Sequence, residues 1–150
     1  PNGCHIAEVE IEPETGEVEI VSYLACDDAG NLINEQIVHG QMHGGITQGA
    51  GHIFHEQAVY DTGGQLLTGS FMDYAMPRAT DIPDLATRFD ESVPTQMNPL
   101  GAKGAGEAGC HGATPAIVNA VIDALGVQEI DMPLTPERVW RALRHDSKRS

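Results

Sequence analysis

The stretch Met42-His-Gly-Gly-Ile-Thr-Gln-Gly-Ala-Gly-His-Ile-Phe-His-Glu56 decides the fold. Its apolar residues Ile46, Ile53 and Phe54 recur at roughly helical steps, so it predicts a helix. Four glycines interrupt the stretch, and each weakens a helix by about 0.5–1 kcal/mol relative to alanine. A helix that tolerates them is expected to lie close against another backbone or a ligand. The alternative is that the glycines prevent a helix here.

A β-hairpin is predicted before this helix. From Ile6 to Glu12 apolar and acidic residues alternate, so one face of the strand is acidic and wet. Residues 13–16 form a turn, in which Gly16 supplies a positive φ angle. The alternation resumes from Glu17 to Ile20 and is expected to run on to Ala25, before residues 27–30 break the strand.

The chain after the helix is predicted to be less regular. Ala58–Tyr60 and Leu66–Phe71 are expected to pair as a second hairpin around a glycine-containing turn. An irregular connection, Tyr74–Leu85, contains two prolines, and Thr87–Val93 alternates as a strand does. The segment Pro94–Ala113 is dense in glycine and proline and predicts a loop.

Two further helices are predicted near the end of the chain. Thr114 and Pro115 are typical of a helix start, and Gly126 ends that helix. Its apolar stripe consists of Ile117, Val118, Val121, Ile122 and Leu125. Thr135-Pro136 has the same capping pattern and begins a last short helix with Val139, Trp140 and Leu143. These elements predict an α+β class, with hairpins packed against glycine-rich and amphipathic helices in a single domain over residues 1–150.

Charge and composition exclude several classes of protein. The formal net charge of −14 argues against a nucleic-acid partner, and no apolar run approaches the roughly 20 residues that cross a bilayer. The three cysteines are widely spaced, which disfavours a disulfide framework or structural zinc and favours a cytoplasmic location. The chain begins Pro1-Asn-Gly-Cys4, without a signal pattern or an initiator Met, as expected of a piece of a longer protein.

The loop Gly101-Ala-Lys-Gly-Ala-Gly-Glu-Ala-Gly109 is the first candidate for chemistry. Closely spaced glycines let backbone N–H groups approach a ligand, although the order of residues is not that of a phosphate-binding P-loop. Glu107 stands between Gly106 and Ala108, whose small size leaves its carboxylate open to a bound group, as a general base requires. The alternative is a flexible turn with a solvated glutamate.

Histidines are the second candidate. His52, His55 and Glu56 could share a helix face and bind a metal. No third ligand at diagnostic spacing and no HExxH pattern accompany them, so surface or hydrogen-bonded histidines are the favoured interpretation and no metal site is predicted.

Five segments resemble, in the same order, those of the xanthine dehydrogenase, aldehyde oxidase and aerobic carbon monoxide dehydrogenase large-subunit family. They are Pro1-Asn-Gly-Cys-His5, Gly40-Gln-Met-His-Gly-Gly-Ile-Thr-Gln-Gly49, Gly69-Ser-Phe-Met-Asp-Tyr-Ala-Met-Pro-Arg78, Asn98-Pro-Leu-Gly-Ala-Lys-Gly-Ala-Gly-Glu-Ala-Gly109 and Pro133-Leu-Thr-Pro-Glu-Arg-Val-Trp140. The resemblance covers essentially the whole chain, and it implies the carboxy-terminal part of a molybdopterin-binding large subunit.

The resemblance also implies roles for individual residues. In that family the glutamate of the loop lies beside molybdenum and takes a proton from the hydroxide bound to the metal, a role that falls on Glu107. A dry, apolar surrounding is expected to raise the pKa of such a carboxyl group. Gln41 matches the glutamine whose amide hydrogen-bonds near the metal. The backbones of Gly40, Lys103, Gly104 and Gly106 are expected to approach the cofactor, molybdenum-molybdopterin in its cytosine dinucleotide form.

The implied partners are the upstream part of the large subunit, iron–sulfur and FAD subunits, and a small-molecule substrate. Because the family's other cofactor loops and its substrate-facing loop do not occur in this sequence, a second hypothesis stays open. In it the chain is a non-catalytic assembly or interaction module that binds no cofactor by itself. A third hypothesis, an anion- or nucleotide-binding protein, rests on the glycines alone. An apolar face left uncovered predicts self-association of the isolated chain.

Overall fold

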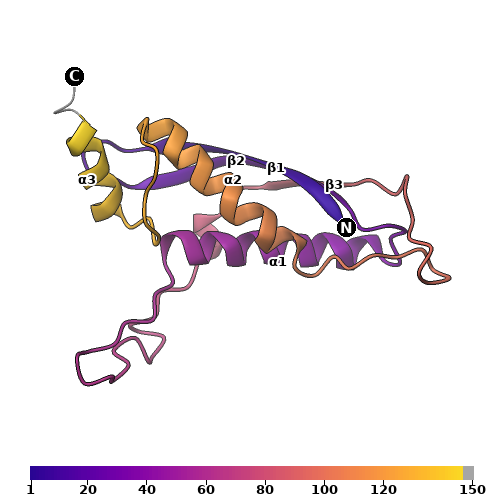
Figure 1. Cartoon of the computed structure of the whole chain (residues 1–150), viewed down its shortest axis with the longest axis horizontal. Helices are drawn as coiled ribbons and strands as arrows, with labels where there is room; N and C mark the ends of the chain where they lie inside the picture. The colour runs from indigo at the N-terminus through magenta and orange to yellow at the C-terminus, as the bar shows by residue number, and fades with distance from the viewer. Residues whose placement is uncertain (147–150) are drawn as a thin grey trace.

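A computed structural model describes residues 1–146, with side chains through residue 144. The elements follow the order β1 (Asn2–Ile11), β2 (Val18–Asp28), α1 (Glu35–Phe54), η1 (Ala79–Asp81), β3 (Leu85–Phe89), α2 (Ala108–Leu125) and α3 (Pro136–Asp146). One three-stranded sheet has the order β1-β2-β3, in which β1 and β2 are antiparallel and β2 and β3 parallel. Helices and sheet are combined as the predicted α+β class requires (Figure 1).

The predicted hairpin is confirmed, and a β-bulge on β2 shifts which of that strand's residues face the core. Glu8, Glu10 and Glu12 are exposed on β1, while Ala7, Val9 and Ile11 are half-buried. The pairing shifts between Glu8 and Val9, so Val21 on β2 is the extra residue. A bulge exchanges the faces of the residues beyond it. The buried positions of β2 therefore change from Ile20 to Tyr23, Ala25 and Asp27.

Strand β2 runs three residues beyond the predicted end at Ala25 and finishes at Asp28. The prediction treated two successive aspartates as a break. The strand continues because both carboxylates have partners: Asp27 faces His5 and Asp28 faces Lys103. The chain turns at Gly30, whose φ of 61° lies in the left-handed region.

Helix α1 begins seven residues before the predicted Met42, at Glu35, and ends at Phe54 instead of Glu56. Asn34 caps it, because its side chain accepts a hydrogen bond from Ile37 N at 3.0 Å. Glu35 in the first turn adds a favourable charge at the positive end of the helix dipole. By pattern alone the residues from Asn34 to Gln41 fit a helix or a loop, because the apolar periodicity is weak around Gly40.

The second predicted hairpin is wrong as a pair of strands. Only an isolated bridge between Tyr60 and Leu66 forms, around a turn held by the Asp61 side chain. The following connection is irregular as predicted, apart from the single 3-10 turn η1. Strand β3 lies at Leu85–Phe89 instead of Thr87–Val93, because its register is set by pairing with Tyr23–Asp27 of β2.

Helix α2 begins at Ala108, six residues before the predicted start at Thr114, and Pro115 lies inside it. Thr114 is no cap, since its hydroxyl donates to the carbonyl of Cys110 within the helix. The earlier turns are stabilised by tertiary contact with α1, which local capping rules do not describe. The predicted end is confirmed, because Gly126 adopts a left-handed conformation at the C-cap.

The glycines of α1 allow α2 to approach closely, as the sequence predicted. A Cβ on Gly45 would lie 3.0 Å from Cys110 N, and one on Gly109 would lie 2.5 Å from Met42 O. A Cβ on Gly49 would lie 2.8 Å from the Ala113 Cβ. Gly44, by contrast, has open space beside it. Two of the four glycines thus form the contact between the helices.

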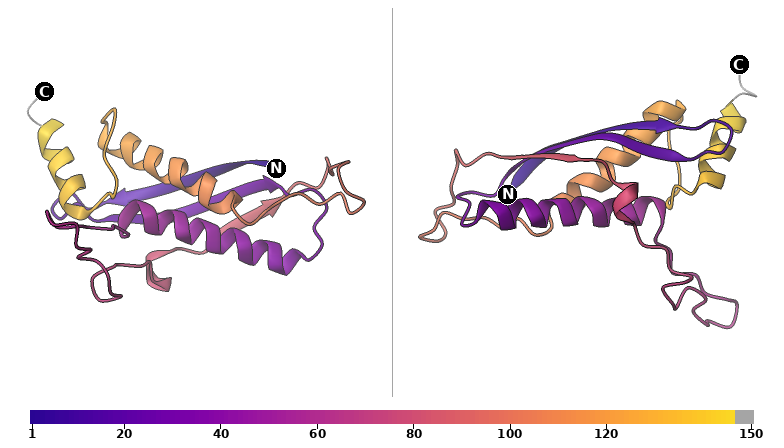
Figure 2. Two further views of the ribbon diagram at one scale, coloured as in Figure 1. Left: turned by 60° about the horizontal axis from the view of Figure 1, so that its bottom comes forward. Right: turned by 180° about the vertical axis from the view of Figure 1, so that it is seen from behind.

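The core lies between the sheet and the helices α1 and α2 (Figures 1 and 2). Its fully buried large side chains come from the sheet, the helices and the loop before α3: Tyr23, Met42, Ile46, Ile53, Ile117, Val121, Leu134 and Val139. The last helix, α3, is confirmed at Pro136 and packs its start against the hairpin turn, where a Cβ on Gly16 would lie 2.6 Å from Trp140 N. Within residues 1–146 no helix is long and apolar enough to cross a membrane.

Candidate active-site loop at the start of helix α2

Gln41 and the loop before α2 lie side by side, although they are far apart in sequence. Gln41 is an exposed residue of α1, and its Oε1 lies 3.7 Å from the position that a Cβ on Gly106 would occupy. Gly106 is followed by Glu107, the N-cap residue of α2. The contact between α1 and α2 therefore brings Gln41 next to the residue that precedes Glu107.

The Glu107 carboxylate is free. It makes no capping hydrogen bond, and in the described part of the chain neither its side chain nor that of Gln41 takes part in a hydrogen bond or ion pair. Glu107 lines a pocket of about 750 Å³, together with Gly104 and Gly106 of the loop and His5 of β1. A carboxylate that lines a pocket without a hydrogen-bond partner can deprotonate a bound group, as a general base does.

Backbone donors next to Glu107 are also free. The N–H groups of residues 104–107 donate no hydrogen bond within the described residues, whereas Lys103 N donates to Ala29 O at 2.8 Å. These N–H groups precede the N-terminus of an 18-residue helix, where unpaired donors and the helix dipole favour oxygen-rich or anionic ligands. The loop can thus hold the oxygens of a cofactor.

Lys103 is anchored to the end of β2. Its Nζ donates to Asp28 Oδ2 in a largely buried ion pair. That hydrogen bond and the bond from Gly30 N hold the pKa of the Asp28 carboxyl below its usual range. The backbones of Gly30 and Ala102 form an isolated bridge beside the pair. Both the ammonium and the backbone N–H of Lys103 are therefore engaged by the protein.

Gly40 and Gly104 are the most open of the predicted positions. Both are exposed, and a Cβ on either would have no atom within 4 Å. Gly40 precedes Gln41 on the outer side of α1, and the structure brings no described residue against it. A requirement for glycine at these two positions would have to come from a group that lies outside the described residues.

The sequence interpretation missed a buried polar network next to the loop. His5 Nε2 lies 2.9 Å from Asp27 Oδ2, and His5 Nδ1 lies 2.7 Å from the Tyr23 hydroxyl. When Nε2–H donates to the ionised carboxylate, Nδ1 accepts from the tyrosine. Burial, and then the charge of Asp27, raises the pKa of Tyr23. The sequence feature that could have indicated this network is the position of His5, which shares the core-facing side of β1 with Ala7 and Val9.

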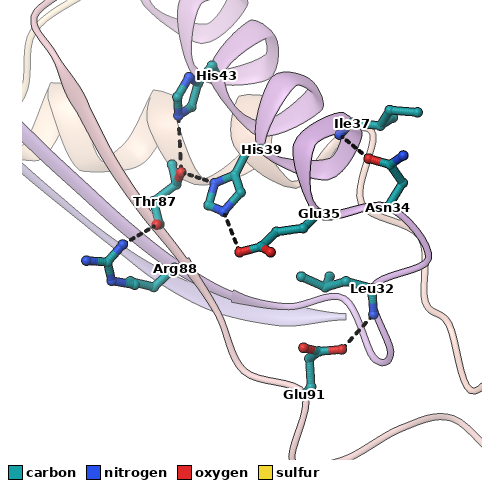
Figure 3. A network of polar contacts seen from close by, with 9 residues as sticks. All are labelled: Leu32, Asn34, Glu35, Ile37, His39, His43, Thr87, Arg88 and Glu91. Atoms are coloured by element: carbon teal, nitrogen blue, oxygen red, sulfur yellow. Dashed lines mark hydrogen bonds and ion pairs between the residues drawn. The ribbon is translucent and has the colours of Figure 1, made fainter.

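A second network fastens α1 to β3 (Figure 3). The buried Thr87 hydroxyl lies 2.6 Å from His39 Nδ1 and 3.1 Å from His43 Nε2, so it can donate to one ring and accept from the other. The histidines weighed as metal ligands in the sequence, His52 and His55, pair with separate carboxylates. His52 Nε2 lies 3.7 Å from Glu56 Oε2, and His55 Nε2 lies 3.7 Å from Asp81 Oδ2. Among the residues described, no three ligands gather around a point.

Residues 1–83 match the family described as the molybdopterin cofactor-binding domain. The chain is 39% identical over 96% of its length to the carbon monoxide dehydrogenase large chain of Hydrogenophaga pseudoflava. It is 42% identical over 95% of its length to the nicotine 6-hydroxylase large subunit of Paenarthrobacter nicotinovorans. Each match covers 18% of the relative. The chain therefore corresponds to less than a fifth of these subunits.

Solved structures have the same fold. The quinoline 2-oxidoreductase of Pseudomonas putida 86 is 40% identical and superposes with a TM-score of 0.89, over 95% of this chain and 18% of that one. A Cu,Mo-CO dehydrogenase is 35% identical, with a TM-score of 0.85 over 91% and 18% of the two chains. Sequence profile, relatives and fold agree: the chain belongs to the molybdopterin-binding large-subunit family of xanthine dehydrogenases, aldehyde oxidases and carbon monoxide dehydrogenases.

Proposed function

We propose that this chain is part of the large subunit of a molybdenum-cofactor-dependent hydroxylase or dehydrogenase, in which Glu107 is the general base. The observation that carries the proposal is the convergence of Gln41 with the Gly106–Glu107 turn, with both side chains free of other partners. The four unpaired N–H groups of residues 104–107 support it, because a molybdopterin dinucleotide presents phosphate and other oxygens to such donors.

Each residue of the site has a distinct part in the proposed reaction. The bound cofactor supplies the oxygen-transfer and two-electron chemistry. Glu107 accepts a proton from the reacting oxygen at its carboxylate, Gln41 donates from its amide to orient the cofactor, and the loop backbone from Lys103 to Gly106 holds it. Gly40 lies beside Gln41 and allows a close approach of the cofactor at that side.

We propose the remaining partners from the family to which the chain belongs. One relative is subunit gamma of a 6-hydroxypseudooxynicotine dehydrogenase complex, and others are named large chains or large subunits. We propose that the rest of the large subunit completes the site, that the cofactor is the cytosine dinucleotide form, and that iron–sulfur and FAD subunits accept the electrons. The substrate would be a small molecule with an electron-poor carbon, such as carbon monoxide, an aldehyde or an N-heterocycle.

The test is to prepare the large subunit that contains this chain and to measure its molybdenum by elemental analysis. Glu107→Gln keeps the shape of the side chain and removes its basicity. We expect it to lower kcat by a factor of roughly 10² to 10⁴ while molybdenum stays bound. Glu137→Gln is the matched control, since Glu137 is exposed on α3 at the far end of the molecule from the start of α2 (Figure 1).

Two results would contradict the proposal. Full activity of the Glu107→Gln variant would remove Glu107 from the reaction. A complete absence of molybdenum from the unaltered subunit, when its partner subunits are also present, would favour the non-catalytic assembly module.

A further inference from the structure

We propose that the last two residues of β2, Asp27 and Asp28, position Glu107 from both sides of its loop. This inference rests on the proposed role of Glu107 as a base. The two carboxylates belong to neighbouring residues of one strand and hold different segments: Asp28 binds the loop before Glu107, and Asp27 binds the histidine that packs against the helix after it. We call this arrangement, Asp27 with His5 and Tyr23 and Asp28 with Lys103, the aspartate clamp.

The Asp28 arm of the clamp fixes the segment four residues before Glu107. The Lys103 ammonium donates to Asp28, and the Lys103 N–H donates to Ala29 O at 2.8 Å. The side chains of the pair are only 16% and 14% exposed, so solvent screens their attraction weakly. A charged and a backbone contact at the same residue determine both the position and the direction of the chain as it enters the Gly104–Gly106 segment.

The Asp27 arm fixes the first turns of α2. The His5 ring packs directly against the backbone of Gly112, because a Cβ built on Gly112 would overlap the ring. Its side chain and that of Asp27 are only 4% and 7% exposed, and hydrogen bonds to Asp27 and Tyr23 determine its orientation. Gly112 follows Glu107 within the second turn of the helix, so a displacement of the ring is transmitted to Glu107.

The segment between the two arms needs such anchors. Gly104 and Gly106 lack side chains, and the backbone N–H groups of residues 104–107 have no partner within the described residues. Glycine populates many backbone conformations, and a misplacement of about 1 Å can cost on the order of 10²-fold in rate. The loop thus keeps its N–H groups and the Glu107 carboxylate free, while Asp28 and Asp27 hold its two ends in place.

The clamp residues are positioning residues, and their test must separate them from a purely structural role. In the assembled holoenzyme we compare Asp28→Asn, Lys103→Met, the charge exchange Asp28→Lys with Lys103→Asp, and Asp27→Asn. Asp81→Asn is the matched control, because Asp81 also pairs with a histidine, His55, but on the 3-10 turn η1. For each variant we measure kcat, KM, molybdenum content, melting temperature and deuterium exchange of residues 101–112.

We expect Asp28→Asn and Asp27→Asn each to lower kcat by roughly 10- to 100-fold, with KM and molybdenum content unchanged. Deuterium exchange should rise in residues 101–112, and the charge exchange should recover part of kcat. In a Glu107→Gln background Asp28→Asn should cause no further loss, because the clamp acts through that carboxylate. The Asp81→Asn control should leave kcat and the exchange of this segment unchanged.

Several results would overturn the inference. Unaltered kcat and exchange in Asp28→Asn, or an equal further loss of kcat in the Glu107→Gln background, would show that the clamp does not act through Glu107. Loss of molybdenum in Lys103→Met but not in Asp28→Asn would show that the ammonium serves the cofactor instead. If the buried Asp27→Asn protein fails to fold, Asp28→Asn decides alone. Failure of the proposed function differs from all of these, because Glu107→Gln would then be fully active.

Discussion

The start of helix α2 and the segment between α1 and η1 are opposites in packing. At the start of α2, backbones meet where Gly45 and Gly109 lack side chains, and the buried polar groups beside them are all hydrogen-bonded. Most of the segment 57–78 extends away from the body of the molecule, before Pro77 returns to pack against Gly51 (Figures 1 and 2). There, Phe71 and Met72 are 88% and 94% exposed, although the turn that carries them is well hydrogen-bonded.

The comparison separates two kinds of region: packed contacts within this chain, and exposed surface that another molecule can cover. Tyr74 ties the extended segment to the end of α1 through a 2.7 Å hydrogen bond to Glu56 Oε2, so its course is defined. An ordered segment that holds large apolar side chains in water is typical of an interaction surface. The start of α2 should therefore be sensitive to substitution in this chain alone, and the segment 57–78 should not.

The largest effect is expected at the contact between the helices. Gly109→Val would place side-chain atoms against Met42 O and Ile46 N, which are 2.5 and 2.9 Å from a Cβ at this position. Backbone atoms cannot move aside as a flexible side chain can, so we expect a loss of about 3 kcal/mol in the free energy of unfolding, measured with urea. Gly44 lies on the facing helix α1, and a Cβ there would have no atom within 4 Å. Gly44→Ala should therefore be neutral or stabilising by up to about 1 kcal/mol.

A loss in Gly44→Ala equal to that in Gly109→Val would contradict this prediction, because it would show that the loss does not depend on how closely the facing helix approaches.

This helix contact also shows how much of the fold could be predicted. The glycines of α1 correctly indicated a close neighbour, because their cost needs compensation. The start of α2 was mispredicted because Thr114-Pro115 is a strong local capping signal, while the contact of Gly109 with α1 depends on tertiary structure. The second hairpin failed for a related reason: the turn at Asp61 is correct, but no sheet edge stabilises its strands.

The candidate site was predictable to a different extent. Composition could indicate an open glutamate at Glu107, but the choice of Gln41 came from the family resemblance. In the structure Gln41 Oε1 lies 3.7 Å from the Cβ position of Gly106, the residue before Glu107. The pairing of Asp27 with His5 was beyond local patterns, since it depends on the register of β1 and β2 and on the bulge at Val21.

The next effect concerns the polar network beside α2. Tyr23→Phe removes the hydrogen bond to His5 and should cost about 1 kcal/mol at pH 7. The pKa of Tyr23 is raised by burial and by Asp27, so the folded state favours the neutral phenol. Below the ordinary pKa of 10.0 the tyrosine is neutral in both the folded and the unfolded state, so the shift does not affect stability. Above it the unfolded state loses the proton first, so the wild type becomes less stable as pH rises. The difference between variant and wild type should therefore shrink above pH 10.

Urea denaturation at pH 7 and near pH 11 measures this difference. Tyr60→Phe is the control from the extended segment, where the side chain is exposed, and it should change stability at neither pH. A difference between Tyr23→Phe and wild type that stays constant with pH would mean that Tyr23 is not shielded as the structure indicates.

A smaller effect tests whether the charge of Glu107 reaches its neighbours. Burial, and next the negative charge of Glu107, raises the pKa of the Cys110 thiol. Glu107→Gln should lower that pKa and speed alkylation of Cys110 at pH 8 by up to a few-fold, an effect that added salt weakens. The measurement needs Cys4→Ser and Cys26→Ser as background, because both of those thiols are exposed.

The Glu137→Gln control on α3 should leave the alkylation rate of Cys110 unchanged. An unchanged rate in Glu107→Gln as well would mean that the carboxylate points away from the start of the helix. This assay needs no cofactor, so it tests the geometry of the site independently of the proposed activity.

The smallest effect on stability is expected in the extended segment. Phe71→Ser together with Met72→Ser removes two large apolar side chains that touch water in this chain, so the free energy of unfolding should change by no more than about 0.5 kcal/mol. The same substitutions should reduce self-association, measured by sedimentation velocity, because they remove apolar surface that a second molecule could cover. Ser70 and Asp73 keep the turn, through their 2.6 Å hydrogen bond, so the change affects the surface and not the course of the chain. A loss of stability comparable to that of Gly109→Val would erase the contrast between the two regions, since Phe71 and Met72 would then belong to the core of this chain and not to a surface that it offers to others.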